Sequence, residues 1–192
     1  MKEIRTFGQE LKVETRAEGD GKSLVGYAAV FDSNSVEMGG FLRFTESIQR
    51  GAFARTLREN QDVRGLLDHD TSQVIGRTVA GSLTLEEDDY GLRATFTPPD
   101  TFDARRAVEM VNAGLITNMS FGFETVNDKW SIRDGIDHRE LLDVNLFEVS
   151  LVTFPAYPAT SIGVRSLQAI YDQRQKVQPV KLFSYRARLA GL

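Results

Sequence analysis

Alternation of apolar and polar residues is the feature that most restricts the fold of this 192-residue chain. Successive side chains of a strand point to opposite faces, so a period of two marks a sheet with one buried face. The acidic stretch from Glu87 to Gly91 separates two such segments and predicts a hairpin turn. The alternating segments are Ser23–Phe31, Gln73–Ala80, Ser82–Glu86, Leu92–Thr97, Leu115–Phe123 and Leu141–Phe154. The sequence therefore predicts a mainly β protein with antiparallel pairing.

Three further segments have the residue spacing of helices. Gly51–Asn60 is the first. The second begins with Asp100 as its cap and ends at Gly114, where a left-handed residue is expected. The third is Pro158–Gln175, with an apolar stripe at Leu167–Tyr171.

Composition limits the chemistry open to the chain. It has no cysteine and two histidines, which excludes disulfides and thiolate catalysis and disfavours a metal cage, so we expect no metal and no cofactor. Residues 164–192 hold six Lys or Arg and one acid, so an acidic body ends in a basic tail. Few aromatic side chains accompany those charges, and we expect no specific nucleic-acid partner. No apolar run approaches the roughly 18 residues that span a bilayer, so we expect no membrane partner.

Three polar residues lie on strand faces where they need an explanation. His69 shares a face with the apolar Leu67, and Glu148 is the only charge on its face of the last predicted strand. Ser120 lies beside Gly122, which leaves room for another group to approach. A buried carboxylate needs a partner, and holding a histidine that activates a serine would supply one. The three residues together indicate a serine hydrolase.

Each residue also has a structural interpretation. A lone histidine is more often a hydrogen-bonding structural residue than a catalyst, and a strand serine is commonly only a small polar side chain. Glu148 has Arg77 and Arg93 as alternative ion-pair partners. The second histidine, His138, lies in a charged, turn-like stretch and is expected to be exposed. The residues by themselves leave the site undecided.

Five short motifs occur along the chain in a characteristic order. They are Gly26–Phe31, Glu46–Ile48 leading into Gly51–Phe53, Leu67–Asp70, Asn118–Phe123 and Glu148–Tyr157. This order resembles the prohead maturation proteases of tailed bacteriophages over residues 23–165. That family is related to the herpesvirus capsid assembly proteases. The resemblance therefore implies a serine endopeptidase with their fold, a closed antiparallel β-barrel surrounded by helices.

The resemblance also implies catalytic roles. Ser120 is expected to be the nucleophile and His69 the general base, while Glu148 stands where the herpesvirus enzymes have a second histidine. A carboxylate stabilises the charged imidazole at least as well. Asp143 and His138 stay open as alternatives for this third position. The donors of the oxyanion hole are left unassigned, because the loop after Glu148 lacks the arginine of the herpesvirus enzymes.

Processing of the viral shell is the function that the resemblance implies. The expected substrates are the major capsid protein and a scaffold segment, cut inside the immature capsid in the host cytoplasm. Residues 1–165 would form the protease domain. Residues 166–192, the end of the third helix and the basic tail, are a candidate for removal by self-cleavage. The herpesvirus relatives are activated as dimers, which makes Leu167–Tyr171 the candidate interface of a homodimer.

Two other functions stay open at this stage. A non-catalytic scaffold or capsid-assembly protein could keep the protease fold as a binding platform, in which case the three side chains need not meet. A hydrolase of small esters would need a closed apolar pocket, whereas an endopeptidase needs a groove for an extended strand.

Overall fold

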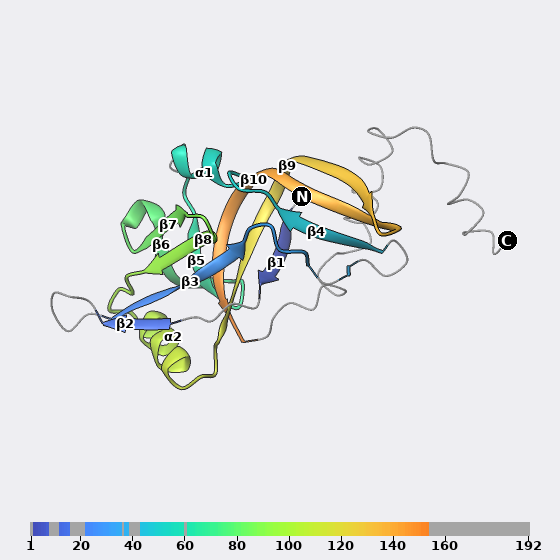
Figure 1. Cartoon of the computed structure of the whole chain (residues 1–192). Helices are drawn as coiled ribbons and strands as arrows, with labels where there is room; N and C mark the ends of the chain where they lie inside the picture. The colour runs from blue at the N-terminus through green and yellow to red at the C-terminus, as the bar shows by residue number, and fades with distance from the viewer. Residues whose placement is uncertain are drawn as a thin grey trace.

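The computed structural model describes residues 2–7, 12–15, 22–35, 37–38, 43–59 and 61–153. Most of these residues form strands, and two α-helices lie at the margin of the β structure (Figure 1). The strands are β1 (Glu3–Phe7), β2 (Lys12–Thr15), β3 (Lys22–Val30), β4 (Phe44–Ile48), β5 (Arg64–Leu67), β6 (Asp70–Arg77), β7 (Leu83–Glu87), β8 (Gly91–Phe96), β9 (Asn118–Arg133) and β10 (Ile136–Val152). The helices are α1 (Ala54–Arg58) and α2 (Phe102–Asn112), and η1 (Thr78–Ala80) is a 3₁₀ turn. The prediction of a mainly β protein is confirmed.

The described strands form two sheets. One has the order β1-β9-β10-β5-β6 with β4 also beside β10, and the other has the order β2-β3-β8-β7. Pairing among the described strands does not close either sheet into the barrel that the resemblance implied. The expected antiparallel pairing holds for most of the described strand pairs, but β4 and β5 both run parallel to β10.

The parallel pairs arise because β4 and β5 follow one another along the same edge of β10. β4 pairs with residues 137–141 of β10 and β5 with residues 148–151. The segment around α1 fills the interval. The amide of Val144 donates to the carbonyl of Ala52 at 3.0 Å, and the hydroxyl of Thr56 donates to the carbonyl of Val144 at 2.8 Å. The backbone of β10 is thereby paired where neither strand reaches it.

Bulges in β10 change which of its side chains face the core. Its pairing with β9 shifts at three places, the last of them between Leu146 and Glu148. The first and the last of these shifts add a residue to β10 and reverse the phase of its alternation, whereas the middle shift adds a residue to β9. The core side chains of β10 are Leu141, Val144, Leu146, Val149 and Leu151. Glu148 and Ser150 therefore lie on the face opposite the core residue Val149.

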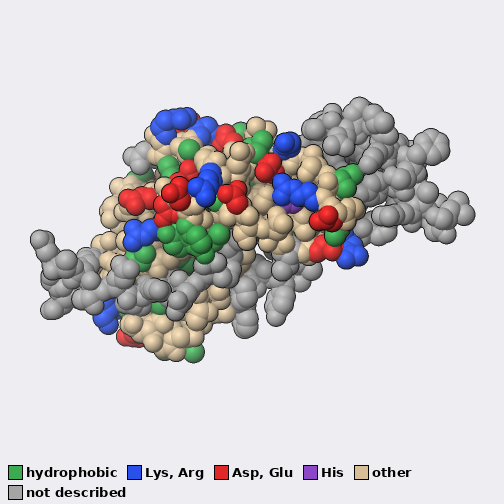
Figure 2. Space-filling view, viewed as in Figure 1, with side chains coloured by type: hydrophobic (Ala, Val, Ile, Leu, Met, Phe, Trp, Pro, Cys, Tyr) green, Lys and Arg blue, Asp and Glu red, His purple; other side chains and the backbone are tan. Residues whose placement is uncertain are grey.

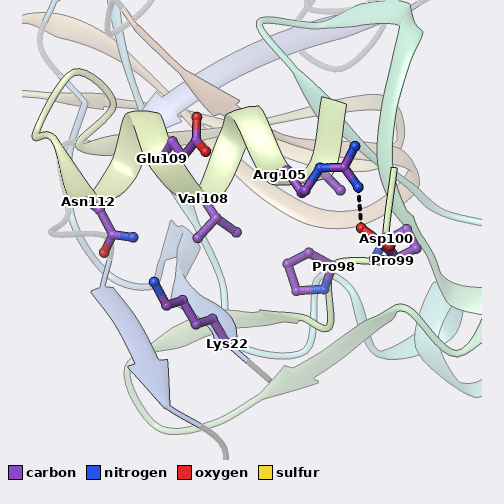
Figure 3. Close-up of a pocket in the computed structure, with 9 residues that line it drawn as sticks. Lys22, Pro98, Pro99, Asp100, Arg105, Val108, Glu109 and Asn112 are labelled. Carbon is purple, nitrogen blue, oxygen red and sulfur yellow. Dashed lines mark hydrogen bonds and ion pairs between the residues drawn. The ribbon is translucent and has the colours of Figure 1, made fainter. Parts of the chain in front are cut away.

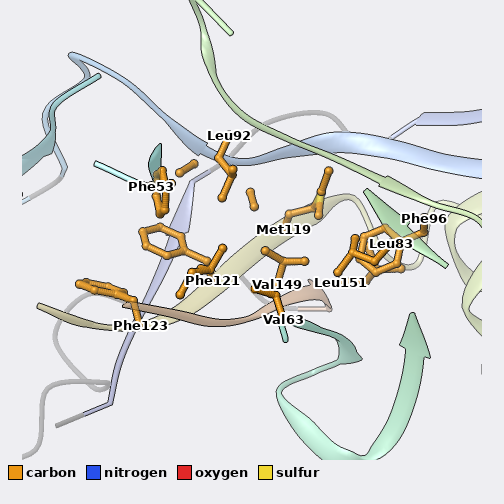
Figure 4. Packing of buried hydrophobic residues seen from close by; sticks show 14 of the residues in the cluster. Phe53, Val63, Leu83, Leu92, Phe96, Met119, Phe121, Phe123, Val149 and Leu151 are labelled. Carbon is orange, nitrogen blue, oxygen red and sulfur yellow. The ribbon is translucent and has the colours of Figure 1, made fainter. Parts of the chain in front are cut away.

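The two sheets pack around one apolar core (Figure 4). β9 contributes Met119, Phe121 and Phe123, and β8 contributes Leu92 and Phe96. Phe53, which precedes α1, packs edge-on against Phe121 with the ring centroids 5.4 Å apart. The apolar face predicted for β9 is confirmed, and Ser120 lies on the other face of that strand.

Phe96 also fixes the hairpin formed by β5 and β6. Gly65 and Gly76 are paired across this hairpin. A Cβ atom at Gly65 would lie 2.3 Å from the ring of Phe96, and one at Gly76 would lie 3.0 Å from it. The ring thus rests directly on glycine backbone, which no other residue type would allow. This contact holds the hairpin, whose turn carries His69, against the second sheet.

A buried ion cluster anchors β1, the first strand, to its sheet. Arg139 on β10 binds Glu3, Glu46 and Asp128, and Arg5 binds Glu3 and Glu46. Burial raises the pKa of Glu3, but Arg139 and Arg5 outweigh it and bring the pKa to about 2. Breaking such a buried pair costs about 3–5 kcal/mol, because one charge is left without a partner. β1 is therefore held firmly beside β9.

The helices differ in detail from the prediction. Thr101, not Asp100, caps α2, because its hydroxyl accepts a hydrogen bond from the amide of Ala104 at 3.3 Å. The left-handed stop at Gly114 is confirmed, with φ of 69°. The first predicted helix is shorter, and α1 covers only Ala54–Arg58.

Some expectations lie outside the described residues. These are the third helix at 158–175, its apolar stripe, the domain boundary at 165 and the basic tail. Three described strands, β1, β2 and β4, were not predicted.

In the described part of the chain, no helix is long and apolar enough to cross a membrane. Acidic and basic side chains are intermixed over the face shown in Figure 2, where no patch of a single sign stands out.

Candidate active site

His69 lies in the two-residue turn between β5 and β6, and not on a strand as predicted. Leu67 pairs with Asp70 across this turn, and both turn residues have positive φ, 48° for Asp68 and 61° for His69. Positive φ at both positions is the geometry of a type I′ hairpin. Glycine, asparagine and aspartate tolerate it, but for other residues, histidine included, it costs free energy. Leu67 packs in the core. The turn takes the imidazole away from the core, to the face where Glu148 lies.

Asp68 ties this turn to the end of β10. Its amide donates to the carbonyl of Leu151 at 2.9 Å. Its Oδ1 atom accepts hydrogen bonds from the amide of Thr153 at 2.8 Å and from the hydroxyl of Thr153 at 3.0 Å. A left-handed backbone at residues other than glycine costs free energy and persists only where surrounding contacts stabilise it. The bonds made by Asp68 provide such contacts.

The structure brings His69 and Glu148 into direct contact. Nδ1 of the imidazole lies 2.8 Å from Oε1 of the carboxylate, which is almost completely buried. An ionised carboxylate only accepts hydrogen bonds, so Nδ1 carries the proton and Nε2 of a neutral ring holds the lone pair. Nε2 is also buried and has no hydrogen-bond partner among the described residues.

Two further groups bind the carboxylate of Glu148. Ser150 donates to Oε2 at 2.5 Å, and the ammonium of Lys2 lies 3.3 Å from Oε1. Burial raises the pKa of Glu148, but the hydrogen bond and charge of His69, the bond from Ser150 and the charge of Lys2 together lower it below its usual value. The carboxylate therefore stays ionised at neutral pH and is an effective partner for an imidazolium.

Gly122 makes space for this carboxylate. It lies opposite Glu148 across the β9–β10 pair. A Cβ atom at position 122 would lie 2.2 Å from Oε1 of Glu148 and 2.6 Å from Cε of Lys2. The room that the sequence predicted beside Ser120 is thus filled by the carboxylate itself.

Ser120 lies on the same side of the sheet as this cluster. It pairs with Ser150 across β9 and β10 and with Thr6 across β9 and β1. Side chains paired across strands have Cβ atoms about 4.5–5.5 Å apart, so Ser120 directly faces Ser150, the residue that donates a hydrogen bond to Glu148. The hydroxyl of Ser120 is fully buried and donates to the carbonyl of Arg5 at 2.7 Å. The structure therefore places Ser120 opposite Ser150, the serine that binds Glu148, and directs the hydroxyl of Ser120 toward β1.

The two alternatives for the third position are engaged elsewhere. Asp143 binds Arg55, with an N–O distance of 2.9 Å. His138 is fully buried, so the expectation that it is exposed is wrong. The reason is that β10 runs straight through this stretch and pairs with β4, whose Thr45 and Ser47 hydroxyls lie 2.8 Å and 2.9 Å from the two ring nitrogens.

The arginines considered as structural partners of Glu148 bind other carboxylates. Arg77 forms two hydrogen bonds with Asp62, at 2.7 Å and 2.5 Å. Arg93 lies 4.0 Å from Glu86. The structural interpretation of Glu148 as the partner of either arginine is therefore wrong.

A separate cavity of about 310 Å³ lies between α2 and the start of β3 (Figure 3). Charged side chains line much of it, among them Lys22, Arg105 and Glu109, and His69, Ser120 and Glu148 do not. It is not the apolar pocket that a small-ester hydrolase needs. Within the described residues, no group of three or more His, Asp or Glu side chains is arranged to hold a metal ion.

Comparison with known proteins identifies the family. The family model of the caudovirus prohead serine proteases matches residues 9–173. The chain belongs to this family. The structure of the capsid assembly protease gp21 of bacteriophage T4 is similar, at 12% sequence identity and a TM-score of 0.55, over 80% of this chain and 98% of that chain. This likeness shows a shared fold, and no curated protein matches the chain.

The resemblance read from the five motifs is thereby confirmed, and the prohead protease is a serine peptidase of capsid maturation. Sequence analysis did not single out two groups that bind Glu148. Ser150 carried a usable signal, because residues two apart on a strand share a face. Lys2 carried none, since its contact depends on the pairing of β1 with β9.

Proposed function

We propose that the prohead protease cleaves peptide bonds with Ser120 as nucleophile, His69 as general base and acid, and Glu148 as the group that orients the imidazole. One observation carries this assignment. Among the described residues, His69 has one nitrogen on the buried carboxylate of Glu148 and the other buried without a partner, and Glu148 in turn binds Ser150, which pairs with Ser120 across β9 and β10. A buried nitrogen without a hydrogen-bond partner costs free energy, and the hydroxyl of a nucleophilic serine is a partner that would offset this cost.

The reaction requires the hydroxyl of Ser120 to leave the carbonyl of Arg5. In the proposed reaction the hydroxyl turns about the Cα–Cβ bond to another staggered position and donates to Nε2 of His69. The hydrogen bond that is lost is worth about 1 kcal/mol, so the rotation is readily reached.

Proton transfer then follows the usual course for such a triad. Nε2 takes the hydroxyl proton as Oγ bonds to the scissile carbonyl carbon, and gives it to the leaving amine nitrogen as the C–N bond breaks. Water, activated by the same nitrogen, releases the acyl group as a free acid. The carboxylate of Glu148 stabilises the imidazolium in both steps. The loop considered for the oxyanion donors, residues 154–160, lies outside the described residues.

We further propose that the substrates are the major capsid protein and its scaffold segment, cut inside the procapsid, and that residues 166–192 are removed by self-cleavage. Membership in the prohead protease family supports this proposal. Enclosure raises the local concentration of enzyme and substrate, which would keep activity low before assembly. A homodimer through Leu167–Tyr171 is part of the proposal, and a monomeric mass in solution would overturn it. So is a closed β-barrel of the herpesvirus-protease type.

Intact mass spectrometry tests the assignment of the nucleophile. The parent, Ser120→Ala and the control Ser33→Ala, an exposed serine, are each expressed alone and with the cognate capsid protein. We expect loss of the tail and trimming of the capsid protein with the parent and the control, and unchanged masses with Ser120→Ala. Unchanged masses with all three folded proteins would favour the non-catalytic scaffold protein.

A further inference from the structure

Ser150 is the one group that binds the carboxylate of Glu148 from within the same strand. Its side chain is fully buried, and its hydroxyl donates to Oε2 at 2.5 Å. A bond of this length from a hydroxyl to a charged oxygen belongs to the strong class of hydrogen bonds. The bulge after Leu146 places both side chains on the face away from the core. The pairing of Ser150 with Glu148 is therefore built into the shape of β10.

The bond to Ser150 decides which way the carboxylate faces. Glu148 has two oxygens, and His69 needs one of them at Nδ1 in a fixed direction. With Oε2 held by Ser150, Oε1 is directed at Nδ1, 2.8 Å away. Without that bond the carboxylate could rotate about its last torsion, which is broad for glutamate. Oε2 would then be a buried acceptor in search of another donor.

The same contact separates the roles of two serines that face one another. Ser120 and Ser150 are paired across β9 and β10, and both are fully buried. The hydroxyl of Ser150 points at a carboxylate whose pKa is lowered, which is a poor base for removing a serine proton. Among the described residues, the hydroxyl of Ser120 binds only the backbone carbonyl of Arg5, which it can leave.

We propose that Ser150 is a positioning residue, which holds the carboxylate of Glu148 so that Oε1 fixes the tautomer and orientation of His69. This rests on the proposed function, in which His69 is the base. Groups that orient metal ligands in the same manner are worth about tenfold to a hundredfold in affinity or activity, and we expect an effect of that size here.

The kinetic test compares Ser150→Ala with Ser150→Thr, which keeps the hydroxyl. Cleavage of the cognate capsid protein is followed with the full chain, in the parent and in Glu148→Gln. We expect Ser150→Ala to lower kcat about tenfold to a hundredfold with KM little changed, and Ser150→Thr to restore most of it. In the Glu148→Gln background, Ser150→Ala should cost less than about threefold, since the group it positions is already lost. Equal losses in both backgrounds would overturn the proposal.

A spectroscopic readout keeps the proposal testable without activity. The chain has two histidines, so nitrogen NMR of labelled histidine resolves each ring, and His138→Gln assigns them. We expect a single Nδ1–H tautomer for His69 in the parent and in Ser120→Ala, and a mixture in Ser150→Ala. An unchanged tautomer in folded Ser150→Ala would overturn the positioning role.

The two proposals fail in different ways. If Ser150→Ala were inactive and Ser120→Ala active, Ser150 would be the nucleophile and its positioning role would be wrong. If the parent itself cleaved nothing while the tautomer of His69 still depended on Ser150, the proposed function would fail and the positioning contact would stand.

Discussion

The two histidines of this chain are both largely buried, yet their surroundings differ in one decisive respect. His138 has a hydroxyl at each ring nitrogen, Thr45 at Nδ1 and Ser47 at Nε2, and lies in the middle of a regular ladder. His69 has a carboxylate at Nδ1 and nothing at Nε2 among the described residues, and lies in a turn with left-handed backbone. One ring is fully satisfied by the fold, and the other is not.

This difference separates a structural histidine from a candidate base. A fully bonded ring contributes to stability and has no lone pair to offer a substrate. Within the described part of the chain, His69 is bonded at one nitrogen only, and it lies on a strained turn. This arrangement lowers the stability of the fold, and a residue with a purely structural role would not require it. Substitutions that exchange these two properties are the sharpest way to test the contrast.

The largest contrast is expected between His69→Gln and His138→Gln. His69→Gln should reduce capsid-protein cleavage by about 10³-fold or more, because no base remains for the serine proton. His138→Gln should leave cleavage per folded molecule within about threefold but lower the free energy of unfolding by about 1–3 kcal/mol, through loss of the hydroxyl contacts. Cleavage rates and urea unfolding, measured on both variants, check the two effects. Loss of activity in folded His138→Gln would remove the distinction.

A second contrast concerns the two carboxylates considered for the third position. Glu148→Gln should reduce cleavage by about 10²–10⁴-fold, because an amide neither fixes the tautomer of His69 nor stabilises the imidazolium. Asp143→Asn, the matched control, only weakens the partly exposed ion pair with Arg55, so its activity should stay within about twofold. Comparable losses in both variants would move the third role away from Glu148.

Local alternation was a good guide to elements whose pairing is also local. The β7–β8 hairpin and the apolar face of β9 were predicted because each depends on neighbouring residues alone. β1, β2 and β4 were missed because they are short and are defined by distant partners. The bulges of β10 have no sequence signal of their own, since an inserted residue is visible only against the opposing strand.

The candidate site shows the same division. The sequence placed His69 on a strand because Leu67-Asp68-His69-Asp70 lacks the glycine or asparagine that usually marks a type I′ turn. His138 was expected to be exposed because it lies in a charged stretch. The pairing of β10 with β4 that buries it joins residues far apart in the sequence and leaves no local signal. The choice of Ser120, His69 and Glu148 came from the family resemblance, and the structure brings the last two into contact.

The strained turn allows a third, smaller contrast, between Asp68 and its neighbour Asp70. Asp68→Ala removes the acceptor for both bonds from Thr153 and puts alanine in the left-handed region, so we expect about a tenfold loss of cleavage as the imidazole shifts. Asp68→Asn keeps the acceptor and should stay near the parent. Asp70 accepts hydrogen bonds from Ser72 within β6, and Asp70→Asn should have little effect on the rate. A full rate in folded Asp68→Ala would show that the turn needs no clamp.

The smallest expected effect concerns pH, and it distinguishes the histidines through stability. Burial and the nearby charge of Arg133 lower the pKa of His138, although Glu140 and Glu46 act in the opposite direction. In the unfolded chain the ring titrates near 6.5, so below that pH the unfolded state binds a proton that the folded state refuses. The contribution of this ring to stability is therefore complete above about pH 6.5 and declines as the pH falls toward its lowered pKa, by at most about 1.4 kcal/mol per pH unit.

His138→Gln should remove that decline. Unfolding curves of the parent and the variant, measured between about pH 5 and 8, should converge as the pH falls below 6.5, because only the parent loses stability through this ring. A difference in stability that stays constant with pH would mean that His138 takes up its proton as easily in the folded protein as in the unfolded chain. The two hydroxyls of β4 would then be accommodating a charged ring, and the contrast with His69 would rest on geometry alone.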